Sequence, residues 1–168
     1  MFIFLIGMMG SGKSYWAQQI AAAANLHWMD LDAEIEKENS MSVKEIFETE
    51  GEANFRLKEK KALHKLAGYN NIIIATGGGT PCFFDNMDWM NTHGTTIFIN
   101  EPVGILVERL QNEKAKRPLI SNSPNDDLEI LLQQRSAERS GVYSQAKHTI
   151  TGSLASVVDF LKIVNSSV

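Results

Sequence analysis

Residues 7–14, GMMGSGKS, have the types and the spacing needed to bind the phosphate groups of a nucleotide. They match the pattern G-x-x-x-x-G-K-[ST] in full, between a strand-like run at 1–6 and a helix-like run at 14–24. In this pattern backbone N–H groups converge on phosphate oxygens, the lysine reaches the β- and γ-phosphates, and the hydroxyl coordinates Mg²⁺. The stretch therefore predicts a site for a nucleoside triphosphate with Mg²⁺. The predicted nucleotide contacts in it are Gly10, Ser11, Gly12, Lys13 and Ser14.

Two carboxylates follow the next predicted strand. Asp30 and Asp32 are separated by one residue, so in an extended segment both side chains point to one face. Beside a triphosphate, such a pair suits a hydrated magnesium ion and an incoming hydroxyl group. Asp32 is also a suitable N-cap for a helix at 33–38, with Asp30 as an exposed strand end. The residues alone leave both interpretations open.

For other candidate residues, the sequence alone does not distinguish a functional role from a structural one. Gly77, Gly78 and Gly79 follow an apolar, strand-like run. A turn of three glycines permits close approach of the backbone to a ligand, although glycine turns are common after strands. Arg56 lies on a predicted helix rich in Lys and Glu, and Arg139 lies in the sequence ERSGVY. Each arginine by itself is equally compatible with a solvated surface.

Arg117 stands before Pro118 in a segment, 111–126, whose composition changes to Asn, Lys, Ser and Pro. That composition is typical of a mobile loop. An arginine in such a loop is suited to close over bound phosphates. We therefore expect residues 112–126 to form a flexible lid that contributes Arg117 to the reaction.

Alternating strands and helices must hold these residues in place. The hydrophobic pattern predicts strands at 1–6, 26–31, 72–75, 95–99 and 149–151, with 72–75 buried on both faces of a parallel sheet. It predicts helices at 14–24, 33–38, 42–66 with an interruption at Gly51, 103–110, 128–138 and 154–164. This order predicts an α/β doubly wound fold with about five parallel strands flanked by helices. Ligands bind at the carboxyl ends of such strands, so the candidate residues should face one crevice.

Length and composition narrow the class of protein. A chain of 168 residues suits one domain, 1–168, and no segment approaches the roughly 20 apolar residues of a membrane span. The net charge of −4 disfavours nucleic-acid binding, which needs clustered Lys and Arg. Cys82 is the one cysteine, which rules out an internal disulfide and fits a reducing compartment. We expect a cytoplasmic protein without a targeting signal, and nothing in the sequence demands more than a monomer.

Taken together, these motifs resemble the shikimate kinase family, a group of P-loop kinases, from the first strand to about Thr149. The matching pieces are GMMGSGKS, MDLDAEIE, SVKEIFETEGEANFRLKE, ATGGG, RPLI and ERSGVY. Many kinases share the first piece, but the whole set in this order is specific. The resemblance implies Mg²⁺-dependent transfer of the ATP γ-phosphoryl group to the 3-hydroxyl of shikimate. The products would be ADP and shikimate 3-phosphate, on the route to chorismate and the aromatic amino acids.

The resemblance also implies a role for each candidate residue. Arg56 and Arg139 would hold the substrate carboxylate, and Asp32 would bind the ring hydroxyls and orient, or accept a proton from, the attacking one. Asp30 and Ser14 would hold Mg²⁺, directly or through water. The remaining implied roles are substrate contacts by the amides of Gly77, Gly78 and Gly79, charge neutralisation by Lys13 and Arg117, and an adenine contact by Arg109. The chain departs from the family's usual sequence at Tyr15, at 80–84 and in the lid.

Two other functions remain as alternatives. One is another P-loop kinase for a small metabolite, such as a gluconate or nucleoside monophosphate kinase. A pair of arginines with a hydroxyl-binding aspartate fits a polyhydroxylated acid better than a base. The other is a non-catalytic regulator that binds a nucleotide, which would be expected to have lost Lys13, Asp32 or Arg117. All three residues are present.

Overall fold

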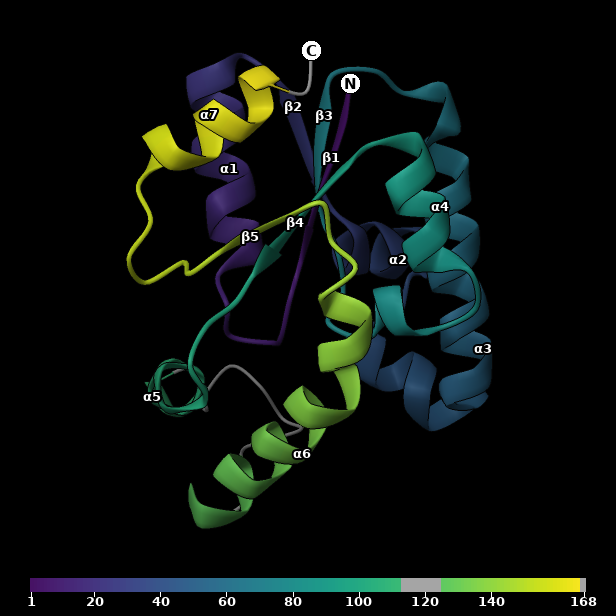
Figure 1. Cartoon of the computed structure of the whole chain (residues 1–168). Coiled ribbons are helices and arrows are strands. Elements are labelled where there is room, and N and C mark those ends of the chain that lie inside the picture. Colours follow the sequence, from purple (N-terminus) through teal and green to yellow (C-terminus); the bar gives the residue numbers. More distant parts are fainter. Residues whose placement is uncertain (113–124, 167–168) are drawn as a thin grey trace.

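A computed structural model describes residues 1–112 and 125–166 of the chain. Helices lie on both sides of a central sheet (Figure 1). In chain order the elements are β1 (Phe2–Ile6), α1 (Lys13–Ala24), β2 (His27–Asp30), α2 (Leu31–Asn39), α3 (Val43–Lys65), η1 (Leu66–Gly68), β3 (Ile72–Ala75), η2 (Thr80–Cys82), α4 (Asn86–His93), β4 (Thr95–Ile99), α5 (Val103–Asn112), α6 (Asn125–Tyr143), β5 (His148–Ile150) and α7 (Val157–Ser166), where η marks a short 3₁₀ helix.

The five strands form one parallel sheet in the order β2-β3-β1-β4-β5. The central strand β1 pairs with β3 through Phe2 and Ile72 and with β4 through Ile3 and Thr95. All four residues of β3 are buried, as its continuous β-branched run predicts for a strand covered on both faces. The edge strands β2 and β5 are more exposed. The predicted fold class and strand number are confirmed.

Side chains that alternate along the strands divide the core between the two faces of the sheet. Ile3 and Leu5 of β1 pack with residues of α1 and α7 in one cluster. Phe4 and Ile6 pack with α2, α3, α4, α5 and α6 in a larger cluster on the other face. Figure 1 shows the same division, with α1 and α7 on one side of the sheet and α2, α3 and α4 on the other. Because every strand runs in the same direction, the segments that follow them meet at one end of the sheet.

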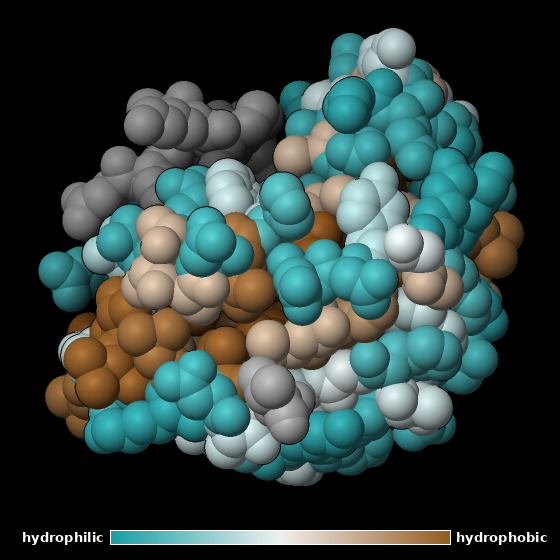
Figure 2. Space-filling view, turned by 90° about the horizontal axis from the view of Figure 1, so that it is seen from above, coloured by the Kyte–Doolittle hydropathy of each residue, from teal (hydrophilic) through white to brown (hydrophobic). Residues whose placement is uncertain are grey.

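The molecule also has hydrophobic residues on its surface. Figure 2 views the end at which the strands begin, where hydrophobic side chains gather on the side of α7. Val158 of α7 is 58% exposed, and Leu154 before it is 85% exposed. In the part of the chain that the structure describes, no helix is both long enough and apolar enough to cross a membrane.

Several element boundaries differ from those expected. The helix predicted at 33–38 with Asp32 as its N-cap is α2, which begins at Leu31 and is capped by Asp30. Asp30 has extended backbone angles, and its Oδ1 accepts hydrogen bonds from the backbone N–H groups of Asp32 and Ala33. Helix α6 is longer than the predicted 128–138, and α7 begins later than the predicted 154. Helix α4 was not predicted from the sequence.

The long helix α3 begins and breaks where the sequence predicts. Ser42 and Glu45 form the expected capping box, because Ser42 accepts from the Glu45 N–H while Glu45 accepts from the Ser42 N–H. Gly51 has φ 81° and ψ 167°, so the backbone leaves the helical conformation there and resumes it afterwards. The second part of α3 carries Arg56 towards the end of β3.

Candidate active site

The phosphate loop, Gly7–Ser14, connects β1 to α1. Gly10 and Gly12 have φ of 81° and 86°, conformations that side chains rarely adopt. Lys13 Nζ donates hydrogen bonds to the carbonyl oxygens of Gly7 and Met8, both at 2.9 Å, so the ammonium group folds back over the loop. The first turn of α1 holds no acidic residue that would neutralise the positive end of the helix. The loop is thus built to bind an anion at a helix N-terminus.

Asp30 links the phosphate loop to α2. While its Oδ1 caps α2, its Oδ2 accepts a hydrogen bond from Ser14 Oγ at 2.5 Å. A hydroxyl and a carboxylate oxygen, side by side at the phosphate loop, are donors that suit Mg²⁺. In residues 1–112 and 125–166, no group of three or more His, Cys, Asp or Glu could hold a metal ion. This donor set fits an ion that also takes its ligands from phosphates and water.

Asp32 lies in the first turn of α2 rather than in an extended segment. Its Oδ1 is buried and has no hydrogen-bond partner in the described part of the chain. Burial raises the pKa of Asp32 to about 7, and the negative charges of Glu59 and Asp30 act in the same direction against Lys13 and Arg56. Near neutral pH both protonation states are therefore populated, which suits a group that exchanges a proton with a ligand.

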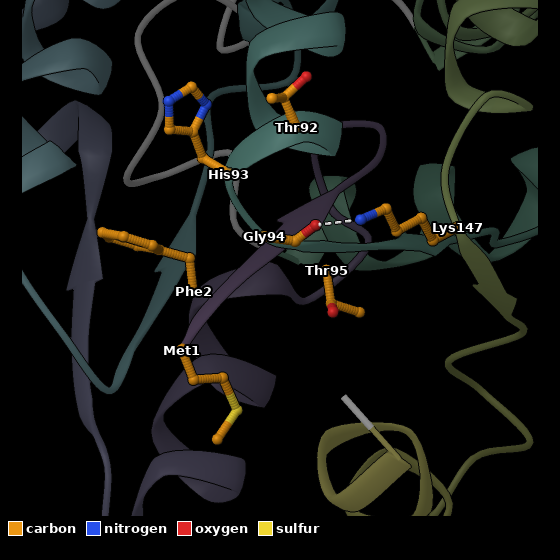
Figure 3. Close-up of a pocket in the computed structure, with 7 residues that line it drawn as sticks. All are labelled: Met1, Phe2, Thr92, His93, Gly94, Thr95 and Lys147. Atoms are coloured by element: carbon orange, nitrogen blue, oxygen red, sulfur yellow. Dashed lines mark hydrogen bonds between the residues drawn. The ribbon is translucent and has the colours of Figure 1, made fainter. Parts of the chain in front are cut away.

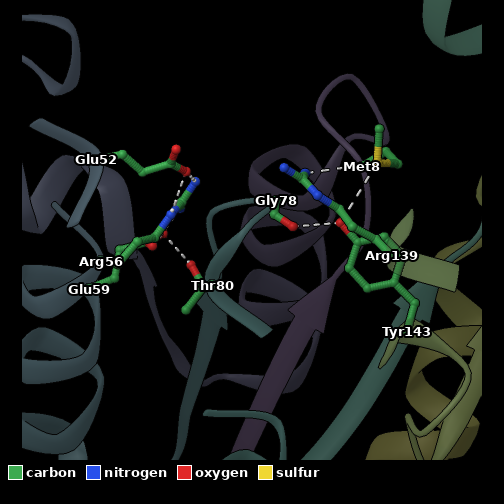
Figure 4. A network of polar contacts seen from close by, with 8 residues as sticks. All are labelled: Met8, Glu52, Arg56, Glu59, Gly78, Thr80, Arg139 and Tyr143. Carbon is green, nitrogen blue, oxygen red and sulfur yellow. Dashed lines mark hydrogen bonds and ion pairs between the residues drawn. The ribbon is translucent and has the colours of Figure 1, made fainter. Parts of the chain in front are cut away.

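Arg56 is held by two carboxylates. Its NH1 donates to Glu59 Oε2 at 2.6 Å, and its Nε and NH2 donate to Glu52 Oε1 at 3.2 and 2.8 Å. Glu59 is 1% exposed, and its Oε1 accepts from Thr80 Oγ1 at 2.6 Å. The guanidinium also lies 4.2 Å from the ring centroid of Phe83. These contacts fix the direction of Arg56 (Figure 4).

The segment 80–84, in which the sequence departs from the pattern that it otherwise resembles, supports these contacts. Thr80 binds Glu59, and Phe83 covers the Arg56 guanidinium. The N–H of Cys82 donates to the carbonyl of Gly79 at 2.8 Å, which closes the turn. Phe83 therefore packs against a predicted substrate-binding side chain, whereas Phe84 lies under Lys60.

The glycine turn, Gly77–Gly79, leaves space for the candidate side chains around it. None of the three glycines has a positive φ, so backbone conformation does not demand glycine here. A Cβ on Gly77 would lie 2.7 Å from Asp32 Oδ1 and from Glu59 Oε1. A Cβ on Gly79 would lie 2.5 Å from Arg56 NH1. Side chains at 77 and 79 would thus displace the carboxylates and the guanidinium.

Arg139 reaches the same turn from α6. A Cβ on Gly78 would lie 3.3 Å from Arg139 NH1, and this guanidinium makes no ion pair with the carboxylates that the structure describes. Tyr143 lies one helical turn later, and its hydroxyl donates to the Gly78 carbonyl at 2.5 Å. Burial raises the pKa of Tyr143 to about 12, which keeps it a donor. Figure 4 shows Arg56 and Arg139 approaching the turn from opposite sides.

Arg109 of α5 lies on the other side of the phosphate loop. Its NH1 donates to the Gly10 carbonyl at 3.1 Å, and its NH2 lies 3.1 Å from Glu101 Oε1. The predicted nucleotide contact is therefore next to the loop. Arg117 and nearly all of the predicted lid, 112–126, lie outside the described residues.

The structure brings most of the predicted site together. Gly78 lies between the phosphate loop and the side chains around the glycine turn. A Cβ on Gly78 would lie 3.4 Å from the Gly7 carbonyl oxygen and 3.5 Å from the Met9 nitrogen. No role is predicted from the sequence for Glu59, Thr80 or Tyr143, which the structure places at the site. Glu59 had a local indication, its position three residues after Arg56 on a helix. Thr80 had none, because it meets Glu59 only through the tertiary structure.

The surface has one hollow beside the candidate residues and another far from them. One of about 500 Å³ lies beside Arg56 and is lined by Glu52, Ala53, Arg56, Leu57, Phe83 and Phe84. Another of about 240 Å³ lies at the opposite end of the sheet, where β1 begins (Figure 3). It is lined by Met1, Phe2, Thr92, His93, Gly94, Thr95 and Lys147, and Lys147 already donates to the Gly94 carbonyl. The second hollow is remote from the phosphate loop.

Comparisons with known proteins agree with this geometry. A family model described as shikimate kinase matches residues 9–166. A shikimate kinase of Phocaeicola vulgatus is 40% identical over 146 residues, 87% of this chain and 83% of that protein. The crystal structure of shikimate kinase from Bacteroides thetaiotaomicron has a TM-score of 0.93 at 35% identity and 98% coverage of both chains. Shikimate kinase from Acinetobacter baumannii in complex with shikimate has a TM-score of 0.85 at 28% identity, over 98% of this chain and 90% of that one.

Proposed function

This chain belongs to the shikimate kinase family and is an ATP-dependent shikimate kinase, and on this premise we propose which of its residues perform the transfer. The reaction moves the γ-phosphoryl group of ATP to the 3-hydroxyl of shikimate, a step in the synthesis of chorismate and aromatic amino acids. The observation that carries the proposed site is the place of the glycine turn, where an added Cβ would meet Asp32, Arg56 or Arg139 on one side and the phosphate loop on the other. Acceptor and donor would therefore meet at Gly78.

Shikimate would bind in the half of the site formed by the glycine turn. Two guanidinium groups, Arg56 and Arg139, are suited to its carboxylate because each presents planar N–H donors. Glu52 and Glu59 already orient Arg56, so little side-chain entropy would be lost when the substrate binds. The backbone amides of Gly77, Gly78 and Gly79 would contact the ring hydroxyls.

ATP would bind in the other half. The N–H groups of Gly10, Ser11 and Gly12 would surround the phosphates, with Lys13 as a positive charge for the β- and γ-phosphates. The oxygens of Ser14 and Asp30 would hold Mg²⁺, directly or through water. The ion would supply positive charge that bridges the phosphates. Arg109 would contact the adenine.

Asp32 would act on the attacking hydroxyl. As the oxygen of shikimate bonds to the γ-phosphorus and the bond to the bridging oxygen of ADP breaks, the hydroxyl proton would pass to the Asp32 carboxylate. Support comes from its buried, unpaired Oδ1 in the described residues and from its raised pKa. Lys13 would stabilise the charge on the transferred group. For Arg117 the support is the RPLI motif alone, and closure of the lid at 112–126 over the phosphates would exclude water.

The alternative acceptors, gluconate and nucleoside monophosphates, are tested by the first experiment. Release of ADP is measured with purified protein, ATP and Mg²⁺, using shikimate, gluconate, a nucleoside monophosphate or no acceptor. Fast release with shikimate alone is expected. Release with another acceptor would contradict the proposed roles of Arg56 and Arg139, and ATP binding without release would favour the non-catalytic regulator. A monomeric state and a cytoplasmic location remain predictions from the sequence.

Replacing Arg139 with lysine should raise KM for shikimate while leaving KM for ATP unchanged. Lysine keeps the charge but cannot present two parallel N–H donors to a carboxylate. A loss of about tenfold in kcat/KM for shikimate is expected, within the range for charged hydrogen bonds. Steady-state kinetics with each substrate varied in turn would measure both constants. An equal loss of ATP affinity would assign Arg139 to folding instead.

A further inference from the structure

Glu101 is a buried carboxylate without an assigned role in the reaction described above. It follows β4, the residue is 7% exposed, and its side chain is completely enclosed. Neither carboxylate oxygen has a hydrogen-bond partner in the part of the chain that the structure describes. Burial of an unpaired carboxylate is costly. The ion pair with Arg109, at 3.1 Å from NH2 to Oε1, is therefore what compensates the charge of Glu101.

The surroundings of Glu101 are shaped to hold it in place. Gly152, in the turn between β5 and α7, has no side chain, and a Cβ there would lie 2.7 Å from Glu101 Oε1 and 3.4 Å from Trp16 Nε1. Trp16 belongs to the first turn of α1 and packs on Phe160 of α7, with ring centroids 4.7 Å apart. The Glu101 carboxylate thus lies between Arg109 and the Gly152 backbone, and Trp16 stands next to Gly152.

Arg109 connects this carboxylate to the phosphate loop. The guanidinium forms the ion pair with Glu101 through NH2 and donates a hydrogen bond to the Gly10 carbonyl through NH1, while the side chain remains 37% exposed. NH1 also lies 3.8 Å from the position of a Cβ on Gly12. The guanidinium is therefore held at two corners next to the predicted nucleotide contacts.

We propose that Glu101 is a positioning residue that fixes the Arg109 guanidinium for the nucleotide base and so sets the affinity for ATP. The inference rests on the proposed contact of Arg109 with adenine. A long arginine side chain loses rotamer freedom when it packs against a ligand. With the guanidinium already held by Glu101, this entropy is lost during folding rather than during binding. The carboxylate also neutralises Arg109, so that the base meets a planar surface with little net charge.

The test compares Glu101→Gln with Glu108→Gln, an exposed acidic residue of α5 that precedes Arg109. Glutamine keeps the shape of Glu101 but removes the charge that holds Arg109. We expect KM for ATP and the dissociation constant of ADP to rise about tenfold, within the range for neighbouring residues that interact. The kcat and KM for shikimate should change less than twofold. Glu108→Gln should match the parent protein.

A second variant tests the same geometry without removing the charge. Gly152→Ala places a methyl group 2.7 Å from Glu101 Oε1 and 2.8 Å from Ile99 Cγ2, so the carboxylate would have to move. Gly152 does not have a positive φ, so alanine is compatible with the backbone. It should also weaken ADP binding selectively. Calorimetric titration of ADP, with a melting curve for each variant, separates loss of affinity from loss of folded protein.

Arg109→Ala distinguishes failure of this inference from failure of the proposed site. If Arg109→Ala weakens ADP binding but folded Glu101→Gln does not, the positioning role of Glu101 is wrong and the nucleotide contact of Arg109 stands. If Arg109→Ala binds ADP normally, the contact itself is wrong, and the inference falls with it. A uniform decline of all kinetic constants in Glu101→Gln, together with a lower melting temperature, would show a purely structural role and overturn the inference.

Discussion

Replacing Asp32 with asparagine is expected to remove almost all turnover and, at the same time, to stabilise the protein at neutral pH. Asparagine has nearly the same shape but cannot accept the proton of the attacking hydroxyl. Loss of a positioned base lowers kcat by about 100- to 10,000-fold. The stabilisation follows from the buried position of Asp32, whose charged form lies near Glu59 and Asp30. Activity and stability should therefore change in opposite directions.

The stabilisation by Asp32→Asn should depend on pH, and the raised pKa of Asp32 gives its sign. The pKa of Asp32 is raised from 3.8 to about 7 in the folded protein, so the folded state binds more protons than the unfolded state between these values. The contribution of Asp32 to stability is thus complete below about pH 4 and is lost as the pH rises through 7. Asparagine does not titrate. The advantage of Asp32→Asn should grow from pH 4 to pH 8 and reach about 1 to 3 kcal/mol.

Denaturant unfolding at pH 5 and pH 8, together with kcat at saturating substrates, would test both parts. Asp88→Asn, at an exposed aspartate in the first turn of α4, is the matched control: it should leave kcat unchanged and should not stabilise the protein. A destabilised Asp32→Asn at pH 8 would contradict the raised pKa. In the active protein, kcat/KM for shikimate should increase with pH as Asp32 loses its proton near pH 7.

Replacing Gly79 with alanine is expected to raise KM for shikimate by more than tenfold. The backbone at Gly79 has φ −87° and ψ −22°, which alanine adopts readily, so no backbone strain accompanies the change. The new methyl group would lie 2.5 Å from Arg56 NH1 and 2.8 Å from Arg56 Cζ, and the guanidinium would have to move. Its movement would break the contacts with Glu52 and Glu59 that orient it. A misplaced bidentate donor loses about 1.5 to 3 kcal/mol of binding.

Two other glycines provide a graded comparison. In Gly78→Ala the added Cβ would lie 3.3 Å from Arg139 NH1, which is a looser contact than the one at Gly79. The effect on KM for shikimate should therefore be smaller. Gly104→Ala, in α5 with no atom within 4 Å of the added Cβ, should leave kinetics unchanged and stabilise the protein slightly. Steady-state kinetics on the three variants would measure the order. Equal effects at 78 and 79 would contradict the role assigned to the Arg56 contact.

The sequence by itself determined the phosphate loop, the fold class and most of the candidate residues. These depend on local rules: the loop on glycines and a lysine at fixed spacing, the strands on continuous or alternating apolar residues, and the cap of α3 on Ser42 and Glu45. The five strands and the break at Gly51 were predicted for the same reason. Local rules also explain the error at α2, because Asp30 and Asp32 are both good caps and only the end of β2 selects Asp30.

The tertiary structure alone decided how these residues act on one another. Thr80 reaches Glu59 across 21 residues, Tyr143 reaches Gly78 across 65, and Arg109 reaches Gly10 across 99. Such contacts depend on the strand order β2-β3-β1-β4-β5, which brings the ends of distant segments together. The same packing of distant segments produces three further features: the raised pKa of Asp32, the space left by Gly77 and Gly79, and the buried charge of Glu101. Periodicity cannot predict them, because burial and electric charge act through space rather than along the chain.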